Sequence, residues 1–313
     1  MQEWIASLRP EWRMGLVVLG VLVLASIAVW ALRRARSGKD FSELRSRVRA
    51  WWVMAGVFFA AIALSPMLSV AFFGLMSFWA LKEFITLMRT RPADHGALAL
   101  AFLAVAVQYV LVGMHWYGMF IIFIPVYMSL LVPIRLVLAR ETSGFVAAAA
   151  QIQWGLMAFV FGLSHMAYTL TSSTWVAAGL NGRASLLFLV FVTEMSDVLQ
   201  YVWGKTLGRH KIIPSVSPNK TWEGFLGGIG STVVLSLAIR FLTPFGLGET
   251  LLVAAIVAVA GFFGGAVMSA IKRDFGVKDF GSLIPGHGGM LDRVDSLCFA
   301  APVFFHYVNY FHA

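Results

Sequence analysis

Residues 269–295 read SAIKRDFGVKDFGSLIPGHGGMLDRVD and lie between two long apolar runs. This interval combines cations, aspartates, one histidine and several glycines more densely than any other part of the chain. Its charged residues are Lys272, Arg273, Asp274, Lys278, Asp279, Asp292, Arg293 and Asp295. A loop that only anchors a membrane protein needs cations and no aspartates. The composition of this interval therefore favours a functional site at the membrane surface over an anchor loop.

The whole chain has the composition of a membrane protein. Of its 313 residues, 59% are hydrophobic and 12% are charged, and its mean hydropathy is +0.81. Such a composition is typical of a polytopic membrane protein. Because each span satisfies its backbone hydrogen bonds within its own helix, we expect one all-α polytopic transmembrane bundle.

Apolar windows predict about ten spans. They cover residues 14–32, 51–65, 67–81, 95–114, 118–134, 145–170, 185–203, 224–242, 250–271 and 295–310. The second and third are short and joined by Ser65-Pro66, so they form either a tight hairpin or one broken helix. The first could be mistaken for a secretory signal, but a cationic cluster at 33–39 follows it directly, and we expect it to stay in the mature protein.

The cations predict the orientation of the spans. If the linker at 33–50 is cytoplasmic, alternation places 82–93, 135–144, 204–223 and 272–294 on the same side. These five segments hold 20 of the 24 Lys and Arg residues, as expected for cytoplasmic loops. The N-terminus then lies outside. The net charge of +9 is explained in this way and does not indicate a nucleic-acid partner. The linker is either an anchor of this kind or a segment that gathers anionic lipid.

Two aspartates lie three residues apart at the start of the last span. In a helix, Asp292 and Asp295 share a face and can jointly hold a hard cation through oxygen. Helix capping is the alternative, because acids favour a helix N-terminus. Nearby cations and glycines favour a metal and phosphate site, since phosphates bind cations and free backbone N–H groups.

Other residues of this interval are less specific. His287 either orients the turn, bonds a phosphate or acts as a general base. Lys272 and Arg273 would also be ordinary cations at a helix end. The single cysteine, Cys298, falls in an apolar run, where we expect it to pack.

A second polar interval lies on the same predicted face. Glu194 and Asp197 lie within the seventh span, and carboxylates at that depth are site candidates because they are costly unless partnered. The segments GKTLGRHK at 204–211 and SPNKTWEG at 217–224 follow. On its own, Thr221–Gly224 would be a helix cap. Beside the first interval, it suggests more phosphate or nucleotide contacts.

The pattern S-x-I-K-R-x4-K-D-x-G-x2-I-P-x-H-G-G-M-x-D-R-V-D, at Ser269–Asp295, resembles the C-terminal pattern of phosphatidate cytidylyltransferases without a mismatch. The segments at 204–211 and 217–224 also look like that family. The resemblance extends from about residue 49 to the end of the chain. It implies an additional transmembrane helix with a basic cytoplasmic linker at 1–49, and a cytidylyltransferase-like membrane domain at 50–313.

The resemblance implies transfer of a cytidylyl group from CTP to phosphatidate or a related lipid phosphate, which forms CDP-diacylglycerol and pyrophosphate with Mg²⁺. A second cation and a homodimer are further expectations, as is a site on the cytoplasmic side of a bacterial inner membrane. The implied metal ligands are Asp292, Asp295 and Asp197. The implied phosphate-binding cations are Lys220, Lys272, Arg273, Lys278 and Arg293. The remaining implied substrate contacts are Ser217, Asn219, Thr221, Glu223, Ser269, Asp279, His287, Gly288 and Gly289.

Two departures from the family pattern indicate a divergent branch. The family usually has a small hydroxyl residue and then Ala-Tyr after its aspartate, whereas Asp197 is followed by Val-Leu-Gln-Tyr. The family also carries Gly-Asp-Leu where this chain has Gly264, Gly265 and Ala266. Either a metal ligand is missing, so that the protein binds fewer metal ions or uses a substitute such as Glu194, or the two glycines allow close helix packing.

Three other classes of function remain open. A CTP-dependent lipid kinase would use similar cations but transfer the γ-phosphate. A non-catalytic lipid-phosphate-binding protein would show no metal-dependent turnover. A transporter would normally place its charges near the bilayer midplane, whereas these charges cluster at one face.

Overall fold

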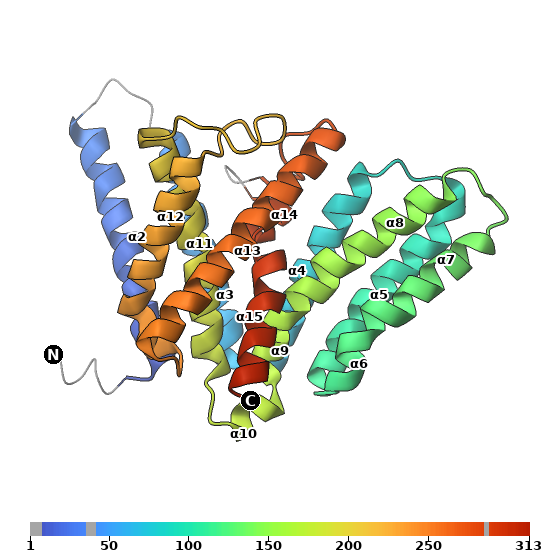
Figure 1. Cartoon of the computed structure of the whole chain (residues 1–313), viewed down its shortest axis with the longest axis horizontal. Coiled ribbons are helices and arrows are strands. Elements are labelled where there is room, and N and C mark those ends of the chain that lie inside the picture. The colour runs from blue at the N-terminus through green and yellow to red at the C-terminus, as the bar shows by residue number, and fades with distance from the viewer. Residues whose placement is uncertain (1–7, 36–41, 285–287) are drawn as a thin grey trace.

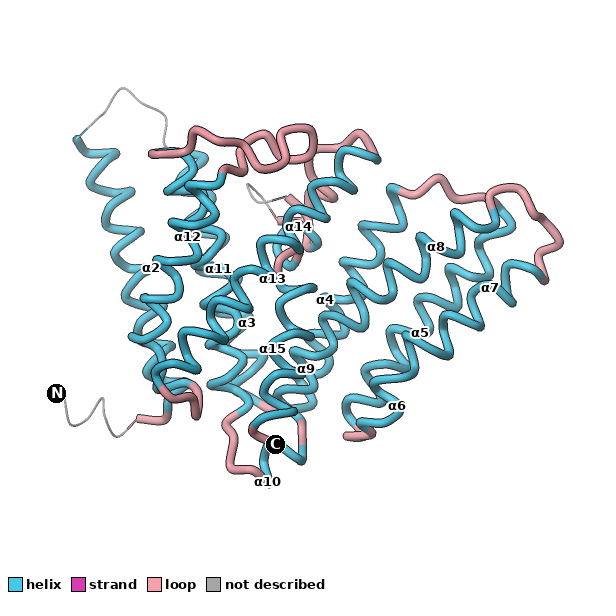
Figure 2. The backbone as a smooth tube through the Cα atoms, in the orientation of Figure 1, coloured by secondary structure: helices cyan, strands magenta, loops and turns pink. Residues whose placement is uncertain are grey.

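The structure is a computed structural model that describes residues 8–35, 42–284 and 288–313. These residues form a bundle of helices joined by short loops (Figures 1 and 2). Within these ranges no strand is present, and the only β-type pairings are two isolated bridges, Lys211–Thr221 and Ile284–Gly288. The prediction of an all-α membrane bundle is confirmed.

Nine helical segments in the described ranges are long and apolar enough to cross a membrane. The elements are α2 (Pro10–Ala35), α3 (Ser42–Leu64), α4 (Pro66–Leu87), η1 (Pro92–Asp94), α5 (His95–Gly113), α6 (Tyr117–Ile122), η2 (Phe123–Met128), α7 (Ser129–Val137), α8 (Phe145–Gly155), η3 (Leu156–Gly162), α9 (Leu163–Thr171), α10 (Ser173–Ala177), α11 (Gly182–Thr206), α12 (Trp222–Ser236), η4 (Leu237–Leu242), α13 (Leu247–Asp274), α14 (Leu291–Val294) and α15 (Leu297–Phe311). The last predicted span corresponds to α14 and α15, so the expected total of about ten is confirmed.

The second and third predicted spans form a tight hairpin. Ser65 has extended backbone angles, and its hydroxyl accepts a hydrogen bond of 3.1 Å from the Leu68 N–H. Pro66 then occupies the first helical position, where its missing N–H costs no hydrogen bond. These two residues end α3 and start α4, and the two helices pack against each other.

The spans alternate in direction, which brings the cation-rich connections to one end of the bundle. In Figure 1 the α4–α5, α7–α8, α11–α12 and α13–α14 connections all lie at the upper end, together with the C-terminal end of α2 and the start of α3. The C-terminus lies at the opposite end. This arrangement agrees with the topology predicted from the charges.

The charged end is built on helices that approach one another closely. Helices α11, α12, α13 and α15 pack against one another, and α14 packs against α4. A Cβ atom added at Gly228 would lie 2.4 Å from the Gln200 side chain, and one added at Gly264 would lie 2.9 Å from the Asp295 carbonyl oxygen. Glycine therefore permits both the α11–α12 and the α13–α15 contacts, as small residues do in membrane proteins. Helix α13 runs obliquely across the bundle in Figure 1.

Candidate active site

Asp292 joins three parts of the charged end. Its Oδ1 accepts a hydrogen bond of 3.1 Å from Lys272 Nζ, on the last turn of α13. Its Oδ2 accepts hydrogen bonds of 2.9 Å from the backbone N–H groups of Phe280 and Gly289. Asp292 is buried, so these donors take the place of water around its charge. The carboxylate therefore fixes the loop between α13 and α14 to both helices.

The glycines of this loop allow the backbone to approach the carboxylates. Gly288 has a φ of +81°, in the left-handed region that favours glycine. A Cβ atom at Gly288 would also lie 2.8 Å from Asp292 Oδ2. The predicted substrate contacts of Gly288 and Gly289 stay predictions. In the structure, these two residues wrap the loop around Asp292.

Glu83 is a buried carboxylate that the sequence analysis missed. It lies near the end of α4, and its two oxygens accept hydrogen bonds from the N–H groups of Met290 (2.9 Å) and Leu291 (2.8 Å). The predicted third span stopped at residue 81, which placed Glu83 in a loop. A carboxylate followed by apolar residues at a membrane helix end was the signal available to find it.

Three further carboxylates form a cluster with one another. Asp197, on α11, accepts a hydrogen bond of 2.7 Å from the Ser296 hydroxyl, and the Ser296 N–H donates to Asp295 Oδ1 at 2.8 Å. The charges of Glu194, Asp197 and Asp295 interact with one another, and all three interact with Arg293. The structure thus brings the two predicted metal ligands Asp197 and Asp295 together, with Ser296 between them.

Lys220 supplies a cation to the same cluster. Its ammonium lies 4.2 Å from the centre of the Phe262 ring and interacts with the charges of Asp197 and Asp295. Burial lowers the pKa of Lys220, and the two carboxylates oppose that effect. Among the described residues, no carboxylate lies within salt-bridge distance of this ammonium, so it is available to an anionic ligand.

The two glycines at the departure from the family pattern have different surroundings. Gly264 lies at the close contact between α13 and α15. In contrast, a Cβ atom at Gly265 would lie 3.4 Å from the Ser296 hydroxyl oxygen and 3.6 Å from Lys220 Nζ, which are ordinary contact distances. Position 265 therefore faces the carboxylate and lysine cluster, and only position 264 requires glycine for packing.

The predicted magnesium site stays a prediction, and two of the carboxylates are of the type that it requires. Mg²⁺ in proteins is usually held by one or two carboxylates together with substrate phosphates and water. Asp197 and Asp295 supply such a pair, and a divalent cation would relieve the repulsion between them. Asp292 already accepts three hydrogen bonds, and its metal role stays a prediction. No group of three or more His, Cys, Asp or Glu residues in the described ranges is arranged to hold a metal ion by itself.

The predicted contacts around α12 have partners within the protein. The Thr221 hydroxyl accepts a hydrogen bond of 3.1 Å from the Gly224 N–H and caps the helix. The Glu223 carboxylate accepts from the N–H groups of Arg209 and His210 at 3.0 and 3.2 Å, so it holds its own loop. Thr221 therefore caps the helix, as the alternative interpretation expected. The substrate contacts of Thr221 and Glu223 stay predictions.

The other predicted residues occupy the same end of the bundle. The Arg273 Nε donates to the Val216 carbonyl oxygen at 3.3 Å and connects the two polar intervals. The Ser269 hydroxyl donates to the Gly265 carbonyl oxygen at 2.7 Å. The side chains of three predicted residues are exposed, namely Asn219, Lys278 and Asp279, and that of Ser217 is half-buried. His287 lies outside the described residues.

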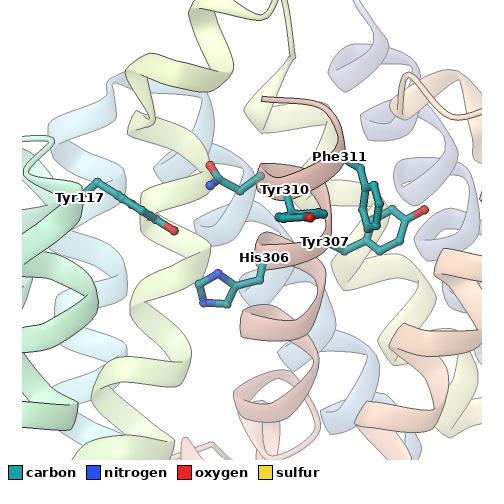
Figure 3. A pocket seen from close by; sticks show the side chains of 6 residues that line it. Tyr117, His306, Tyr307, Tyr310 and Phe311 are labelled. Carbon is teal, nitrogen blue, oxygen red and sulfur yellow. The ribbon is translucent and has the colours of Figure 1, made fainter.

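A pocket at the opposite end of the bundle is separate from this site. It has a volume of about 520 Å³ and is lined by Tyr117, His306, Tyr307, Asn309, Tyr310 and Phe311, as Figure 3 shows. All of these residues except Tyr117 come from α15, near the C-terminus. None of the predicted site residues lines it. The candidate active site is therefore the carboxylate and cation cluster at the charged end.

The helical membrane bundle and the charged cluster at one end are the features with which sequence comparisons must agree. Residues 45–311 match the sequence profile of the cytidylyltransferase family, and the chain belongs to this family.

Two groups of known proteins are similar in sequence to this chain. Over 298 residues the chain is 40% identical to the uncharacterised protein YnbB of Escherichia coli (strain K12). That match covers 94% of this chain and 96% of YnbB. Over 153 residues it is 37% identical to the phosphatidate cytidylyltransferases of Staphylococcus haemolyticus (strain JCSC1435) and Staphylococcus aureus (strain COL). That match covers 46% of this chain and 59% of each of those enzymes.

Proposed function

We propose that this protein transfers the cytidylyl group of CTP to phosphatidate or a related lipid phosphate and releases pyrophosphate. The observation that carries the proposal is the meeting of Asp197, Asp295, Lys220 and Lys272 at one end of the bundle. Carboxylates for a divalent cation and cations for a triphosphate lie side by side there. The names of the staphylococcal relatives support phosphatidate as the acceptor.

The reaction needs positioning and charge neutralisation more than a protein nucleophile. A phosphate oxygen of the lipid attacks the α-phosphorus of CTP, and the bond from that phosphorus to the oxygen bridging the α- and β-phosphates breaks. Pyrophosphate leaves with the electron pair of that bond. Lys220 and Lys272 bind phosphate oxygens through charge-assisted hydrogen bonds. Magnesium held at Asp197 and Asp295 would neutralise the charge that develops on the phosphates.

The charged end of the bundle is the cytoplasmic end in this proposal. Its connections carry most of the Lys and Arg residues, as cytoplasmic loops do. CTP is a cytoplasmic nucleotide, so the site and its soluble substrate are then on the same side. The lipid phosphate reaches the site from the adjacent leaflet.

The position of the radioactive label in CTP tests the proposal against the kinase alternative. Purified protein is incubated with Mg²⁺, a lipid phosphate and either α-³²P-CTP or γ-³²P-CTP. Cytidylyl transfer places the α-label in the lipid and the γ-label in pyrophosphate. A kinase acting on a lipid with a free hydroxyl would place the γ-label in the lipid. If neither label reaches lipid across a panel of phosphatidate, lysophosphatidate and polyprenyl phosphate, the proposal is wrong.

A matched pair of variants checks that turnover arises at this cluster. Asp295→Asn should remove transfer, because it removes one carboxylate of the proposed metal pair. Asp274→Asn is the control, because Asp274 is exposed at the end of α13. Its carboxylate makes no hydrogen bond to a predicted site residue within the part of the chain that the structure describes. Equal activity of the two variants would place the chemistry elsewhere.

A further inference from the structure

Glu83 is a carboxylate in a position where a charge is costly. It lies on α4 next to the buried residues Phe84 and Ile85, and only 9% of its surface is exposed. No Lys or Arg nitrogen of the described residues lies within salt-bridge distance of it. A buried carboxylate without a cation must be stabilised by hydrogen bonds. The structure shows where those hydrogen bonds come from.

The donors are two consecutive backbone N–H groups at the start of α14. Met290 and Leu291 donate to the two Glu83 oxygens at 2.9 and 2.8 Å, across more than two hundred residues of sequence. Met290 is the N-cap residue of α14 and Leu291 is its first residue, so neither N–H group has an acceptor within that helix. Each therefore depends on Glu83, and the carboxylate in turn depends on both.

The fit between Glu83 and the loop is close. A Cβ atom at Gly281 would lie 2.6 Å from a Glu83 oxygen, and one at Gly289 would lie 2.4 Å from the other. The loop thus packs two of its glycines against Glu83. A side chain at either position would displace the Glu83 carboxylate from its present place.

Glu83 and Asp292 accept hydrogen bonds from the N–H groups of consecutive residues. The Gly289 N–H donates to Asp292, and the next two N–H groups donate to Glu83. Asp292 also binds Lys272, and Asp295 follows one helical turn later. Any shift of the backbone at 289–291 would therefore move Lys272, Asp292 and Asp295 relative to one another.

We propose that Glu83 is a positioning residue that sets the pose of the segment Gly289–Asp295 in the active site. It touches neither substrate nor metal, and it acts from α4 through the backbone. The importance of this pose for turnover rests on the proposed function, whereas the backbone contact itself does not. Small misplacements of reacting groups can lower turnover by as much as about 100-fold.

Hydrogen exchange tests the contact without reference to activity. In detergent-solubilised wild-type protein, the amides of Met290 and Leu291 should exchange at least tenfold more slowly than those of the exposed residues Ser282 and Leu283. Glu83→Ala should remove most of this protection. Exchange of the wild-type amides at the rate of the exposed loop would overturn the inference, and this measurement requires no variant to fold.

Kinetics separate positioning from general destabilisation. Glu83→Gln keeps one acceptor oxygen, so it should lower kcat about tenfold and raise the Mg²⁺ concentration for half-maximal activity at least threefold. Glu83→Ala should lose more. A purely structural role would reduce the folded fraction but leave the Mg²⁺ midpoint of the remaining enzyme unchanged, and that result would contradict the proposal.

A matched control comes from the other end of the bundle. Glu249, near the start of α13, accepts a hydrogen bond of 3.2 Å from the Tyr307 hydroxyl, far from the charged loops. Glu249→Gln should leave both kcat and the Mg²⁺ midpoint at wild-type values. If wild-type protein shows no cytidylyl transfer, the proposed function fails, and the exchange data alone then decide whether Glu83 holds the segment.

Discussion

Asp292→Asn should destabilise the protein through the loss of its bond to Lys272. The amide oxygen of asparagine can still accept from the N–H groups of Phe280 and Gly289, as Oδ2 does now. Its NH₂ group then faces the Lys272 ammonium, and two donors cannot bond each other. A charge-assisted hydrogen bond contributes about 1.5–3 kcal/mol. Because the two side chains are only 17% and 4% exposed, little of that is lost to solvent screening.

A double-mutant cycle measures this pair directly. Asp292→Asn, Lys272→Met and the double variant are unfolded by SDS titration in mixed micelles, with the fluorescence of the 11 tryptophans as the signal. We expect Asp292→Asn to lower the free energy of unfolding by about 2 kcal/mol. The cycle should give a coupling energy of similar size between Asp292 and Lys272. Asp274→Asn, at an exposed position, should lose less than about 0.5 kcal/mol.

The neighbouring aspartate provides the contrast. Asp295 interacts unfavourably with the charge of Asp197, and an asparagine oxygen can still accept from the Ser296 N–H. Asp295→Asn should therefore keep wild-type stability while losing turnover. Excess Mg²⁺ should not restore Asp292→Asn, because that variant lacks the anchor of the loop. A coupling energy below about 0.5 kcal/mol, or rescue by Mg²⁺, would show that Asp292 acts as a metal ligand instead.

Four other single substitutions have expected outcomes. Lys220→Met should raise the KM for CTP about tenfold or more through loss of a charge-assisted phosphate contact, measured with α-³²P-CTP, and an unchanged KM would remove Lys220 from the site. Gly265→Asp should fold, and it should lower the Mg²⁺ concentration for half-maximal activity because it adds a carboxylate that faces the carboxylate and lysine cluster. Gly264→Ala should lower the melting temperature because its Cβ would meet backbone at 2.9 Å. The opposite ranking of the two melting temperatures would contradict this geometry. Thr221→Ala should cost about 1 kcal/mol of stability as a lost helix cap, and a neutral result in the same SDS titration would remove that role.

The sequence was sufficient to predict the membrane bundle and the meeting of the two polar intervals. Apolar length sets the spans, and the bias of the cations sets their direction. With alternating spans, 204–223 and 272–294 must lie at one end, and this topology alone places Lys220 and Lys272 at the same end of the bundle. The pairing of Asp197 with Asp295 followed from the same topology together with the family resemblance.

Other features depended on contacts that spacing does not encode. Glu83 meets Met290 and Leu291 only because α4 packs against α14. The different roles of Asp292 and Asp295 depend on which donors reach each carboxylate, and residues three apart in sequence give no indication of that. Likewise, two adjacent glycines look alike in the sequence. Only the packing of α13 on α15 shows that Gly264 is confined and Gly265 is open.

The length of α13 relates the active site to the thickness of the bilayer. With 28 residues at about 1.5 Å each, the helix is about 42 Å long, whereas the hydrocarbon core measures about 30 Å. A helix of this length is accommodated by tilting, in keeping with its oblique path in Figure 1. Lys272 lies on its last turn, so a change of tilt raises or lowers this cation relative to the lipid head groups. The acyl-chain length of the surrounding lipids sets the thickness of the bilayer and thereby the tilt of α13. It thus affects the height of Lys272 relative to the lipid phosphates that it would bind.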